Sequence, residues 1–347
     1  MNFASDNWAG AHAKIAAALA THATGFAAAY GASTLDKKVE KRFCEIFERD
    51  VAVFFVGTGT AANSLALTAV NRPGGIAFAH REAHVIEDEC GAPDFFTGGG
   101  RLMPVDGKLG RINPAGLEAA IARSEVGGVH SGQPMAVTIT QATEAGTVYS
   151  LDEIDAIAGI ARARDLPFHM DGARFANALV SLGVTPAEMT WKRGVDLLSF
   201  GGTKNGCWCA EAIVMFDPAG ARDMSFIRKR AAQLFSKSRF IAAQFDAYFE
   251  DDLWLETATH ANTMAARLAA HITASPKLRL GWQPDANEIF AIIPTAMIES
   301  LKTAGALFYD WHTPHGLGIQ TDETLCRLVT SFATTPDEVD RFGALIA

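Results

Sequence analysis

Ser199-Phe200-Gly201-Gly202-Thr203-Lys204-Asn205-Gly206 continues an apolar run that begins at Val195. A nearly continuous apolar run is expected for a strand whose sheet is covered on both faces, so residues 195–200 are predicted to form a buried strand. Lys204 then lies in a glycine-rich turn just past the end of that strand. A lysine held there suits an amine that forms a Schiff base, although a single lysine is more often simply exposed.

A second polar turn, His169-Met170-Asp171-Gly172-Ala173-Arg174, ends the apolar run that begins at Leu166. A carboxylate at the carboxyl edge of a sheet can accept a hydrogen bond from a protonated pyridine nitrogen, which keeps such a ring an electron sink. The alternative is structural, because Asp171 and Arg174 are about one turn apart and can pair with each other.

A third turn, Gly57-Thr58-Gly59-Thr60-Ala61-Ala62-Asn63, stands between a predicted strand and a predicted helix. Glycines let backbone N–H groups approach an anion, and the helix N-terminus adds a positive dipole, so the run is a candidate phosphate cradle. It also fits the dinucleotide fingerprint G-x-G-x-x-A, with Glu82 about 20 residues further on. A structural turn and an NAD-dependent oxidoreductase are therefore both alternatives at this motif.

The three turns belong to a regular alternation of apolar runs and helical stretches, which predicts an α/β domain with a mostly parallel sheet. Ligands of open α/β sheets bind outside the carboxyl ends of the strands, where all three turns are expected. Strands are predicted at residues 51–56, 76–79, 135–140, 166–170, 195–200 and 211–216, and helices at residues 60–71, 113–124 and 151–164, the last capped by Ser150.

The pattern changes after residue 223, where we predict a domain boundary. Residues 1–223 are expected to form an N-terminal segment and the large α/β domain. Residues 224–347 are expected to form a linking helical region, up to about residue 272, and a small α+β domain. Within the small domain, strands are predicted near residues 278–282, 289–293, 307–311 and 327–332, and helices near residues 295–304 and from residue 336.

Composition excludes several classes of protein. The net charge is −9 and no basic block is visible, which argues against nucleic-acid binding. The alanine-rich stretch 11–29 contains Lys14, Thr21 and His22, so it is expected to be an ordinary helix and not a membrane span. The five cysteines and the lack of a signal peptide favour free thiols in the cytoplasm. A single C-x-C pair at Cys207 and Cys209 is a poor zinc signal, and no metal is expected.

Phosphate loop, then aspartate, then lysine, each after a strand, resembles the layout of the aspartate-aminotransferase-like (fold type I) enzymes that use pyridoxal 5'-phosphate (PLP). The chain is similar, more narrowly, to the low-specificity L-threonine aldolases of the β-eliminating lyase group. The resemblance implies cleavage of L-threonine, L-allo-threonine and related β-hydroxy-α-amino acids to glycine and an aldehyde. It also implies a homodimer or homotetramer with active sites at the subunit interface. The runs that carry it are Ser5-Asp6-Asn7, Tyr30-Gly31, Gly57–Asn63, Glu82-Ala83-His84, His169–Phe175 and Phe200–Gly206.

The resemblance also implies roles for individual residues. Lys204 is similar to the Schiff-base lysine and Asp171 to the partner of the pyridine nitrogen. Both are expected to be catalytic, together with His84 and His130. Arg174 is expected near the ring hydroxyl and the substrate, and His84 is expected to stack on the ring. Gly59, Thr60 and Thr203 are expected at the phosphate, and Arg239 at the phosphate of a neighbouring subunit. The residues expected to bind the substrate are Ser5 and Arg327, at its carboxylate, and Tyr30 and His130.

Each of the outlying residues also has a plain structural interpretation. His84 and His130 can be ordinary loop histidines, and Arg239 can be one more charge on a solvated helix. Arg327 lies among apolar residues, where a buried charge requires a partner, and this favours a functional interpretation. If His84 and His130 flank the β-hydroxyl, both diastereomers of threonine should be cleaved.

Two stretches depart from the family pattern, and either can shape the substrate entrance. They are Cys207-Trp208-Cys209, where Trp208 is a candidate for the pocket mouth, and residues 312–320. Another PLP-dependent lyase, or a racemase, would use the same lysine, aspartate and phosphate cradle, and is an alternative to the aldolase.

Overall fold

The computed structural model describes residues 1–314 and 317–347. Its large sheet has seven strands in the order β1-β9-β8-β7-β6-β2-β3. Strand β9 runs antiparallel to β1 and to β8, and the other neighbours are parallel, so the sheet is mostly parallel as predicted. The strands are β1 (Ala52–Val56), β2 (Gly75–His80), β3 (Arg101–Val105), β6 (Gln133–Thr140), β7 (Phe168–Gly172), β8 (Leu197–Gly201) and β9 (Glu211–Met215).

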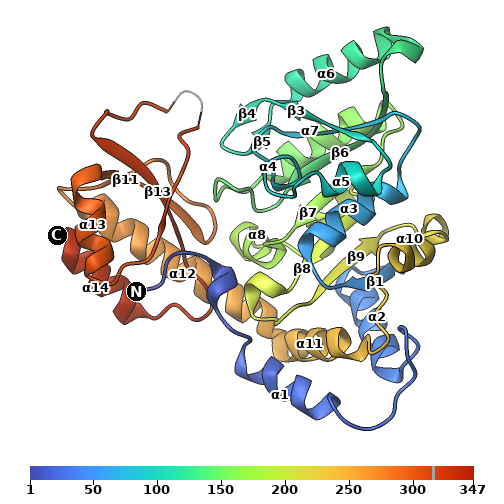
Figure 1. Cartoon of the computed structure of the whole chain (residues 1–347), viewed down its shortest axis with the longest axis horizontal. Coiled ribbons are helices and arrows are strands. Elements are labelled where there is room, and N and C mark those ends of the chain that lie inside the picture. The colour runs from blue at the N-terminus through green and yellow to red at the C-terminus, as the bar shows by residue number, and fades with distance from the viewer. Residues whose placement is uncertain (315–316) are drawn as a thin grey trace.

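Helices pack on both faces of the large sheet (Figure 1). Consecutive strand residues point to opposite faces, so Leu198 packs in one hydrophobic cluster while Leu197 packs in another with α3 and α10. The helices of this lobe are α1 (Ala13–His22), α2 (Thr34–Ile46), α3 (Gly59–Ala69), α4 (His84–Glu87), α5 (Ala92–Phe96), α6 (Pro114–Val126), α7 (Leu151–Arg162), α8 (Phe175–Leu182), α9 (Pro186–Met189), α10 (Met224–Arg230) and α11 (Arg239–Phe249).

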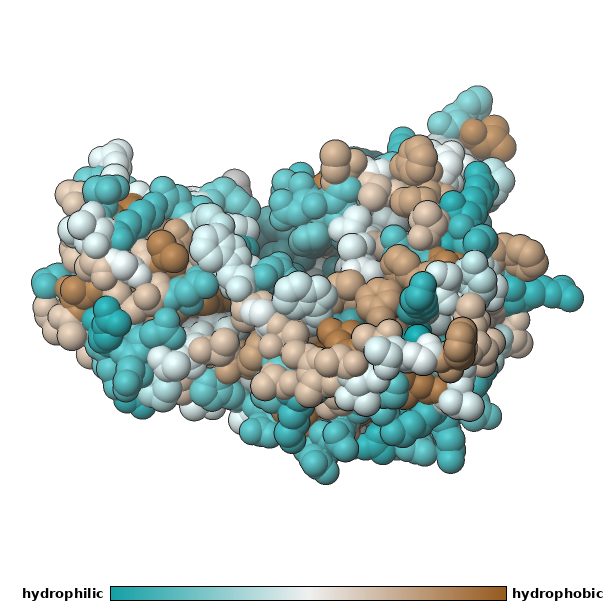
Figure 2. All heavy atoms as spheres, turned by 60° about the horizontal axis from the view of Figure 1, so that its bottom comes forward, coloured by the Kyte–Doolittle hydropathy of each residue, from teal (hydrophilic) through white to brown (hydrophobic). Residues whose placement is uncertain are grey.

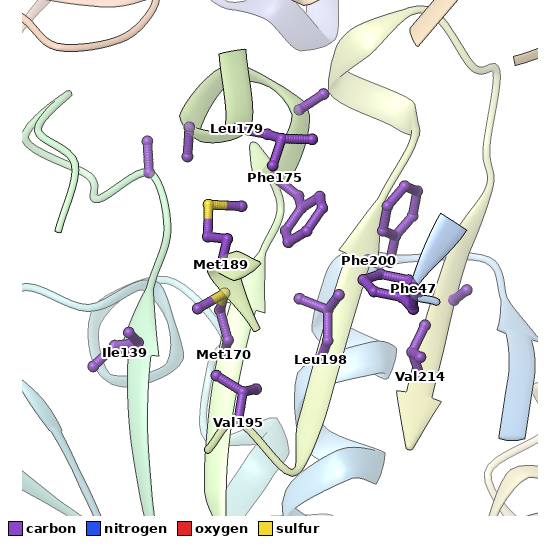
Figure 3. Packing of buried hydrophobic residues seen from close by; sticks show 14 of the residues in the cluster. Phe47, Ile139, Met170, Phe175, Leu179, Met189, Val195, Leu198, Phe200 and Val214 are labelled. Carbon is purple, nitrogen blue, oxygen red and sulfur yellow. The ribbon is translucent and has the colours of Figure 1, made fainter. Parts of the chain in front are cut away.

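The core of this lobe is dominated by phenylalanine. Phe200 of β8 has its ring centroid 5.3 Å from that of Phe175 and 6.4 Å from that of Phe47. Figure 3 shows these rings beside Leu198 and Val214, between the sheet and the helices that cover it. Because β8 is buried on both faces, the turn that follows it is fixed to a rigid support.

The second lobe contains an antiparallel sheet of four strands in the order β10-β11-β13-β12. The long helix α12 joins the two lobes, and the first residues of the chain also lie against the small sheet (Figure 1). Phe3 accepts a hydrogen bond from the amide of Val329 and is part of the small lobe's core. The elements are α12 (Leu253–Ala274), β10 (Arg279–Leu280), β11 (Glu288–Pro294), α13 (Thr295–Thr303), β12 (Tyr309–Asp310), β13 (Glu323–Val329) and α14 (Pro336–Ile346).

Most predicted elements are present, with ends shifted by a few residues. Strand β3, the helices α2, α4, α5, α8 and α9, and the short strands Gly107–Lys108 and Arg111–Ile112 were not predicted. Strand β13 was expected at residues 327–332 but ends at Val329, where its pairing with Glu288 of β11 ends. The chain then turns, and the Thr334 hydroxyl accepts a hydrogen bond from the Ser331 amide. The domain boundary after residue 223 stays a prediction.

The surface is hollowed between the two lobes (Figure 2). Strands of the large sheet end on one side of this region, and β11 and β13 lie on the other. Among the described residues, no helix combines the length and the apolar character needed to cross a membrane.

Candidate active site

A cavity of about 510 Å³ lies between the carboxyl edge of the large sheet and the small sheet. The three turns singled out from the sequence all line it. Its walls include Thr58–Thr60 after β1, Asp171 near the end of β7, Arg174 just after β7, and Lys204 after β8. On the small-sheet side it is lined by Glu288, Trp311 and Arg327. The structure thus brings residues from distant parts of the chain to one concave site.

Lys204 is held by a short 3-10 turn, Thr203–Asn205, directly after β8. The Asn205 side chain donates hydrogen bonds to the Tyr248 hydroxyl (2.7 Å) and to the Trp254 carbonyl (2.8 Å), which anchors the turn to α11 and α12. Gly201 is required there, because a Cβ atom would lie 2.6 Å from the Ala173 carbonyl oxygen. The lysine therefore projects into the cavity from a rigid base.

Glu211, the first residue of β9, lines the cavity on the same side as Lys204. Burial raises the pKa of the Glu211 carboxyl to about 7, against the lowering effects of a hydrogen bond from Thr203 and the charge of Lys204. The sequence analysis did not identify Glu211. Its only signal was an acidic residue at the head of an apolar run, and burying such a charge is costly unless it is paired.

Asp171 is buried and both of its carboxylate oxygens accept hydrogen bonds. The Ala173 amide donates to Oδ1 (3.0 Å), and the Asn63 side chain donates to Oδ2 (2.8 Å). Asn63 also donates to Glu89 (2.8 Å), and Glu89 in turn bonds Nδ1 of His84 (2.9 Å). A continuous polar chain therefore links the carboxylate to the imidazole.

The hydrogen bond to Glu89 raises the pKa of His84 above its usual value, although burial opposes it. Burial raises the pKa of Glu89 as well. Because Glu89 holds Nδ1 of His84, the orientation of the ring is fixed relative to the cavity. Asn63 belongs to a run that was quoted from the sequence. Glu89 stands in the acidic stretch Glu87–Glu89, and such a stretch is typical of an exposed surface, so its role could not be predicted.

The turn after β1 suits an anion. Thr58 caps α3 by accepting a hydrogen bond from the Ala61 amide, and the first amides of a helix have no partner within it. A Cβ atom on Gly59 would meet nothing within 4 Å, so the cavity reaches the backbone there. The Thr60 and Thr203 side chains line the same end. Among the described residues that line the cavity, no cationic side chain comes from the turn after β1.

The opposite end of the cavity contains a series of charges that alternate in sign, of which Asp6, Arg174 and Glu288 are buried. Arg174 makes two hydrogen bonds to Asp6 (2.8 and 3.1 Å) and an ion pair with Glu288 (3.0 Å). Arg327 lies 3.7 Å from Glu288, with its guanidinium 4.2 Å from the centroid of the Trp311 ring. The pairing of Arg174 with Asp171 weighed from the sequence is therefore not formed.

Arg174 and Asp6 stabilise each other's charged forms. Burial works against both charges, but Asp6 and Glu288 raise the pKa of Arg174, and Arg174 lowers the pKa of Asp6. Ser5, expected at the substrate carboxylate, lines the cavity and caps the short 3-10 turn that carries Asp6. Asp6 lay in a quoted run, but neither it nor Glu288 was assigned a role.

Three expected site residues lie outside the cavity of their own chain. His130 is exposed in a 3-10 turn at the amino end of β6, the end opposite the cavity, so it cannot flank a substrate bound there. Tyr30 is 53% exposed, with the Lys229 ammonium 5.3 Å from its ring centroid. Arg239 donates a hydrogen bond to the Gly25 carbonyl (2.9 Å). The two-histidine arrangement inferred from the sequence is therefore wrong within one chain.

Two further sequence interpretations are resolved by the structure. Trp208 lies in a turn, is 65% exposed, and does not line the cavity, whereas Trp311 does. In the segment 312–320, His312 and Pro314 border a small hollow beside the cavity, and residues 315–316 lie outside the described residues.

The topology does not fit a dinucleotide fold. In such a fold the glycine-rich turn belongs to a βαβ unit whose parallel strands lie close together in the sheet. Here β1 and β2, which flank α3, are separated by β9, β8, β7 and β6, and β1 pairs with antiparallel β9. Glu82 does not line the cavity. The NAD-dependent alternative is therefore rejected.

The sequence matches the profile of a family described as "Beta-eliminating lyase" over residues 2–293. The chain is 42% identical over 308 residues to the "Low specificity L-threonine aldolase" of Pseudomonas aeruginosa, covering 88% of each protein. Identity and coverage are the same for the protein of that name from Pseudomonas sp. (strain NCIMB 10558). A solved structure of Leishmania major threonine aldolase matches with a TM-score of 0.92 and 28% identity, covering 99% of this chain and 98% of that one.

Proposed function

The chain belongs to the β-eliminating lyase family, and on this premise we propose that it is a low-specificity L-threonine aldolase. Its fold is that of the fold type I PLP-dependent enzymes, and this family, threonine aldolases included, uses PLP. The proposed reaction cleaves L-threonine and related β-hydroxy-α-amino acids to glycine and an aldehyde. One observation carries the proposal: Lys204, Asp171 and the free amides at Gly59 and Thr60 line a single cavity.

The residues present fit the cofactor. When bound, PLP supplies an electron sink for the pair left on Cα when a bond to it breaks. Lys204 would offer the amine that holds the cofactor covalently, and the buried carboxylate of Asp171 would accept a hydrogen bond from the pyridine nitrogen. The amides of Gly59 and Thr60, with the Thr60 and Thr203 hydroxyls, would hold the phosphate. His84, held by Glu89, would lie against the ring.

We assign the substrate carboxylate to Arg327, assisted by Ser5, and not to Arg174. Arg174 already uses Nε and Nη2 on Asp6 and Nη1 on Glu288. Arg327 is 3.7 Å from Glu288, and its buried Nε has no hydrogen-bond partner among the described residues. A planar guanidinium with a free edge suits bidentate binding of a carboxylate. Holding the carboxylate at one end fixes which bond to Cα is broken.

We also propose a homodimer or homotetramer whose active sites are shared between subunits. Among the described residues that line the cavity after β1 there is no cation, so a bound phosphate would meet only backbone amides and hydroxyls there. Arg239 and Tyr30 lie outside their own cavity, and Arg239 donates a hydrogen bond to Gly25, next to the fully exposed Phe26. Exposed aromatic residues of this size are typical of an interface. A neighbouring subunit's Arg239 would supply the missing charge.

The five free cysteines favour a cytoplasmic location.

Mixing two inactive variants tests the shared sites. Lys204→Ala and Arg239→Ala subunits, unfolded and refolded together, should form hybrid assemblies in which one site has both residues intact. Activity should return in the mixture and be absent from either variant alone. A fully active monomer in solution would refute the shared site.

The reaction itself is tested by incubating the PLP-loaded protein with L-threonine, L-allo-threonine and phenylserine and measuring glycine. Lys204→Ala should abolish glycine formation. The same preparation should be offered L-alanine, L-tryptophan and L-cysteine, which separates the aldolase from a racemase and from another β-eliminating lyase. Glycine formation that is slower than turnover of one of these alternatives would overturn the assignment.

A further inference from the structure

Glu144 is a carboxyl group in the cavity that the roles assigned above do not use. It follows β6, and its Oε1 accepts a hydrogen bond from the backbone amide of His84 at 2.8 Å. Its other oxygen, Oε2, is buried and has no hydrogen-bond partner among the described residues. Glu144 lines both the main cavity and the adjoining hollow beside Trp311 and His312. Glu144 is therefore held in place through one carboxylate oxygen, while its other oxygen is available as an acceptor.

The other buried carboxylates of the site each lie beside groups that already have an assigned role. Both oxygens of Asp171 accept N–H donors, and Glu288 lies between two arginines. Glu89 uses Oε1 for both the Asn63 amide and the His84 ring; its Oε2, like both oxygens of Glu288, has no hydrogen-bond partner among the described residues. Glu211 begins β9, whose first residue pairs with Gly201 beside the Lys204 turn. Glu144 instead lies on the side of His84 and of the small sheet, where Arg327 holds the substrate.

The surroundings of Glu144 keep its proton affinity in a useful range. Burial raises the pKa of Glu144 to about 7, and the charge of Asp171 adds to this, while the His84 amide and ring lower it. The other titratable groups around it are Arg174, Tyr149 and, across the hollow, His312, Glu82, Glu87 and Asp88. A general base is most effective when its pKa is close to the working pH.

His84 is less suited to accept a proton. Its Nδ1 is bonded to Glu89, and that bond raises the pKa of His84, so the ring holds a proton up to a higher pH than it otherwise would. In its protonated form the ring can stabilise negative charge or orient a hydroxyl, but it cannot take up a further proton.

We propose that Glu144 is the catalytic residue that accepts the proton of the substrate β-hydroxyl; this assignment rests on the proposed aldolase function. The O–H proton moves to Oε2 of Glu144, and the O–H electron pair forms the second bond of the aldehyde carbonyl. The Cα–Cβ bond breaks, and its electron pair stays on Cα. A proton then reaches Cα, which yields glycine, and Glu144 returns its proton to solvent.

The test compares two reactions of the same PLP-loaded protein. Cleavage of L-threonine needs a base for the β-hydroxyl, whereas exchange of the glycine α-proton with deuterated water does not. Glu144→Gln keeps an acceptor for the His84 amide. It should lower kcat for cleavage by about 10²–10⁴-fold, the usual contribution of a general base, and leave glycine exchange at the wild-type rate. The visible absorption of the bound cofactor should not change.

The pH profile provides a second readout. In the wild type, kcat/KM for cleavage should rise with pH through about 7, because the carboxyl must lose its proton to act as a base. This limb should be missing in Glu144→Gln. Glu87→Gln is the matched control, since Glu87 is exposed on the neighbouring helix α4 and lines only the small hollow, and it should keep the wild-type rate and profile.

Three outcomes would overturn the assignment: unimpaired cleavage by Glu144→Gln, an equal fall in cleavage and exchange, or an unchanged acid limb. If Glu144→Gln does not fold, Glu144→Ala with added formate replaces it, and formate should restore cleavage without affecting exchange. Failure of the proposed function is distinguishable, because the wild type itself would then form no glycine from β-hydroxy amino acids.

Discussion

Replacing Asp6 by asparagine should destabilise the protein strongly, although the shape of the side chain is kept. Asp6 is 1% exposed, and its carboxylate accepts two hydrogen bonds from Arg174 and one from Asn287. In Asp6→Asn the buried Arg174 keeps only Glu288 as a counter-charge, and an NH₂ group faces N–H donors. Breaking a buried ion pair by removing one partner typically costs about 3–5 kcal/mol. We expect a loss of that size in the free energy of unfolding, measured by urea denaturation at a fixed PLP concentration.

The matched control is Asp340→Asn. Asp340 also forms a two-pronged pair with Arg267, at 2.7 and 2.6 Å, but both side chains are exposed and such surface pairs contribute little. If Asp6→Asn destabilises no more than Asp340→Asn, the buried Asp6–Arg174 pair does not contribute the expected stability.

The pH dependence of the Asp6 effect has a defined sign. Burial opposes ionisation, but Arg174 and Lys204 lower the pKa of Asp6 below its ordinary value. A carboxyl with a lowered pKa in the folded state stabilises the fold above its unfolded pKa of about 3.9, and that contribution is lost as the pH falls through the folded value. The difference between wild type and Asp6→Asn should therefore be full at neutral pH and shrink below about pH 4. A difference that grew on acidification would contradict the charge-based reasoning.

Three further predictions concern the chemistry. Asp171→Asn should lower kcat more than it weakens PLP binding, because the ring nitrogen loses its counter-charge while the amides of Gly59 and Thr60 remain. A fall in kcat of less than about tenfold, the factor that corresponds to one pKa unit, would mean that Asp171 is misassigned. Trp311→Leu should raise KM for L-threonine about fivefold with kcat little changed, since a cation–π contact of about 1 kcal/mol holds Arg327, and Trp311→Phe should restore it; an unchanged KM would count against that role. Both threonine diastereomers should be cleaved, because Glu144 and His84, which line the cavity side by side, can each meet a β-hydroxyl; they should differ by about fivefold for each misplaced hydrogen bond, and His84→Asn should change their ratio in a glycine assay. Cleavage of only one diastereomer would show that the pocket holds the β-hydroxyl more rigidly than this prediction assumes.

The large sheet could be predicted because its strands are apolar on both faces, and each predicted strand there is present. Strand β3 escaped because it is the edge strand, with Arg101 exposed and a proline at residue 104, so its sequence has neither a long apolar run nor a clear alternation. The end of β13 was misplaced because its last paired residue is set by β11, which is a tertiary constraint that residues 327–332 do not record.

The sequence predicted the candidate site residues that lie in turns at the ends of strands. It did not predict those that are buried charged residues. Lys204, Asp171 and the Gly57–Asn63 turn could be found from their positions alone. Glu211 and Glu288 each stand at the head of an apolar run, and the argument that singled out Arg327, that a charge among apolar residues needs a partner, applies equally to them. Glu144 could not be found in this way, because only the folded chain shows that one of its oxygens has no partner.

The charges at the end of the cavity opposite the turn after β1 suit the substrate carboxylate that we propose binds there. Asp6, Arg174, Glu288 and Arg327 alternate in sign from the N-terminal segment, through the large sheet, to the small sheet. Each inner charge has a counter-charge on both sides, but Arg327, the last, has one at 3.7 Å only and a buried Nε without a partner. A buried donor without a partner is unfavourable, so an anion that completes the series is stabilised most at this point. Because Asp6 and Arg327 come from opposite ends of the chain, the same series that links the two lobes also forms the proposed carboxylate-binding site between them.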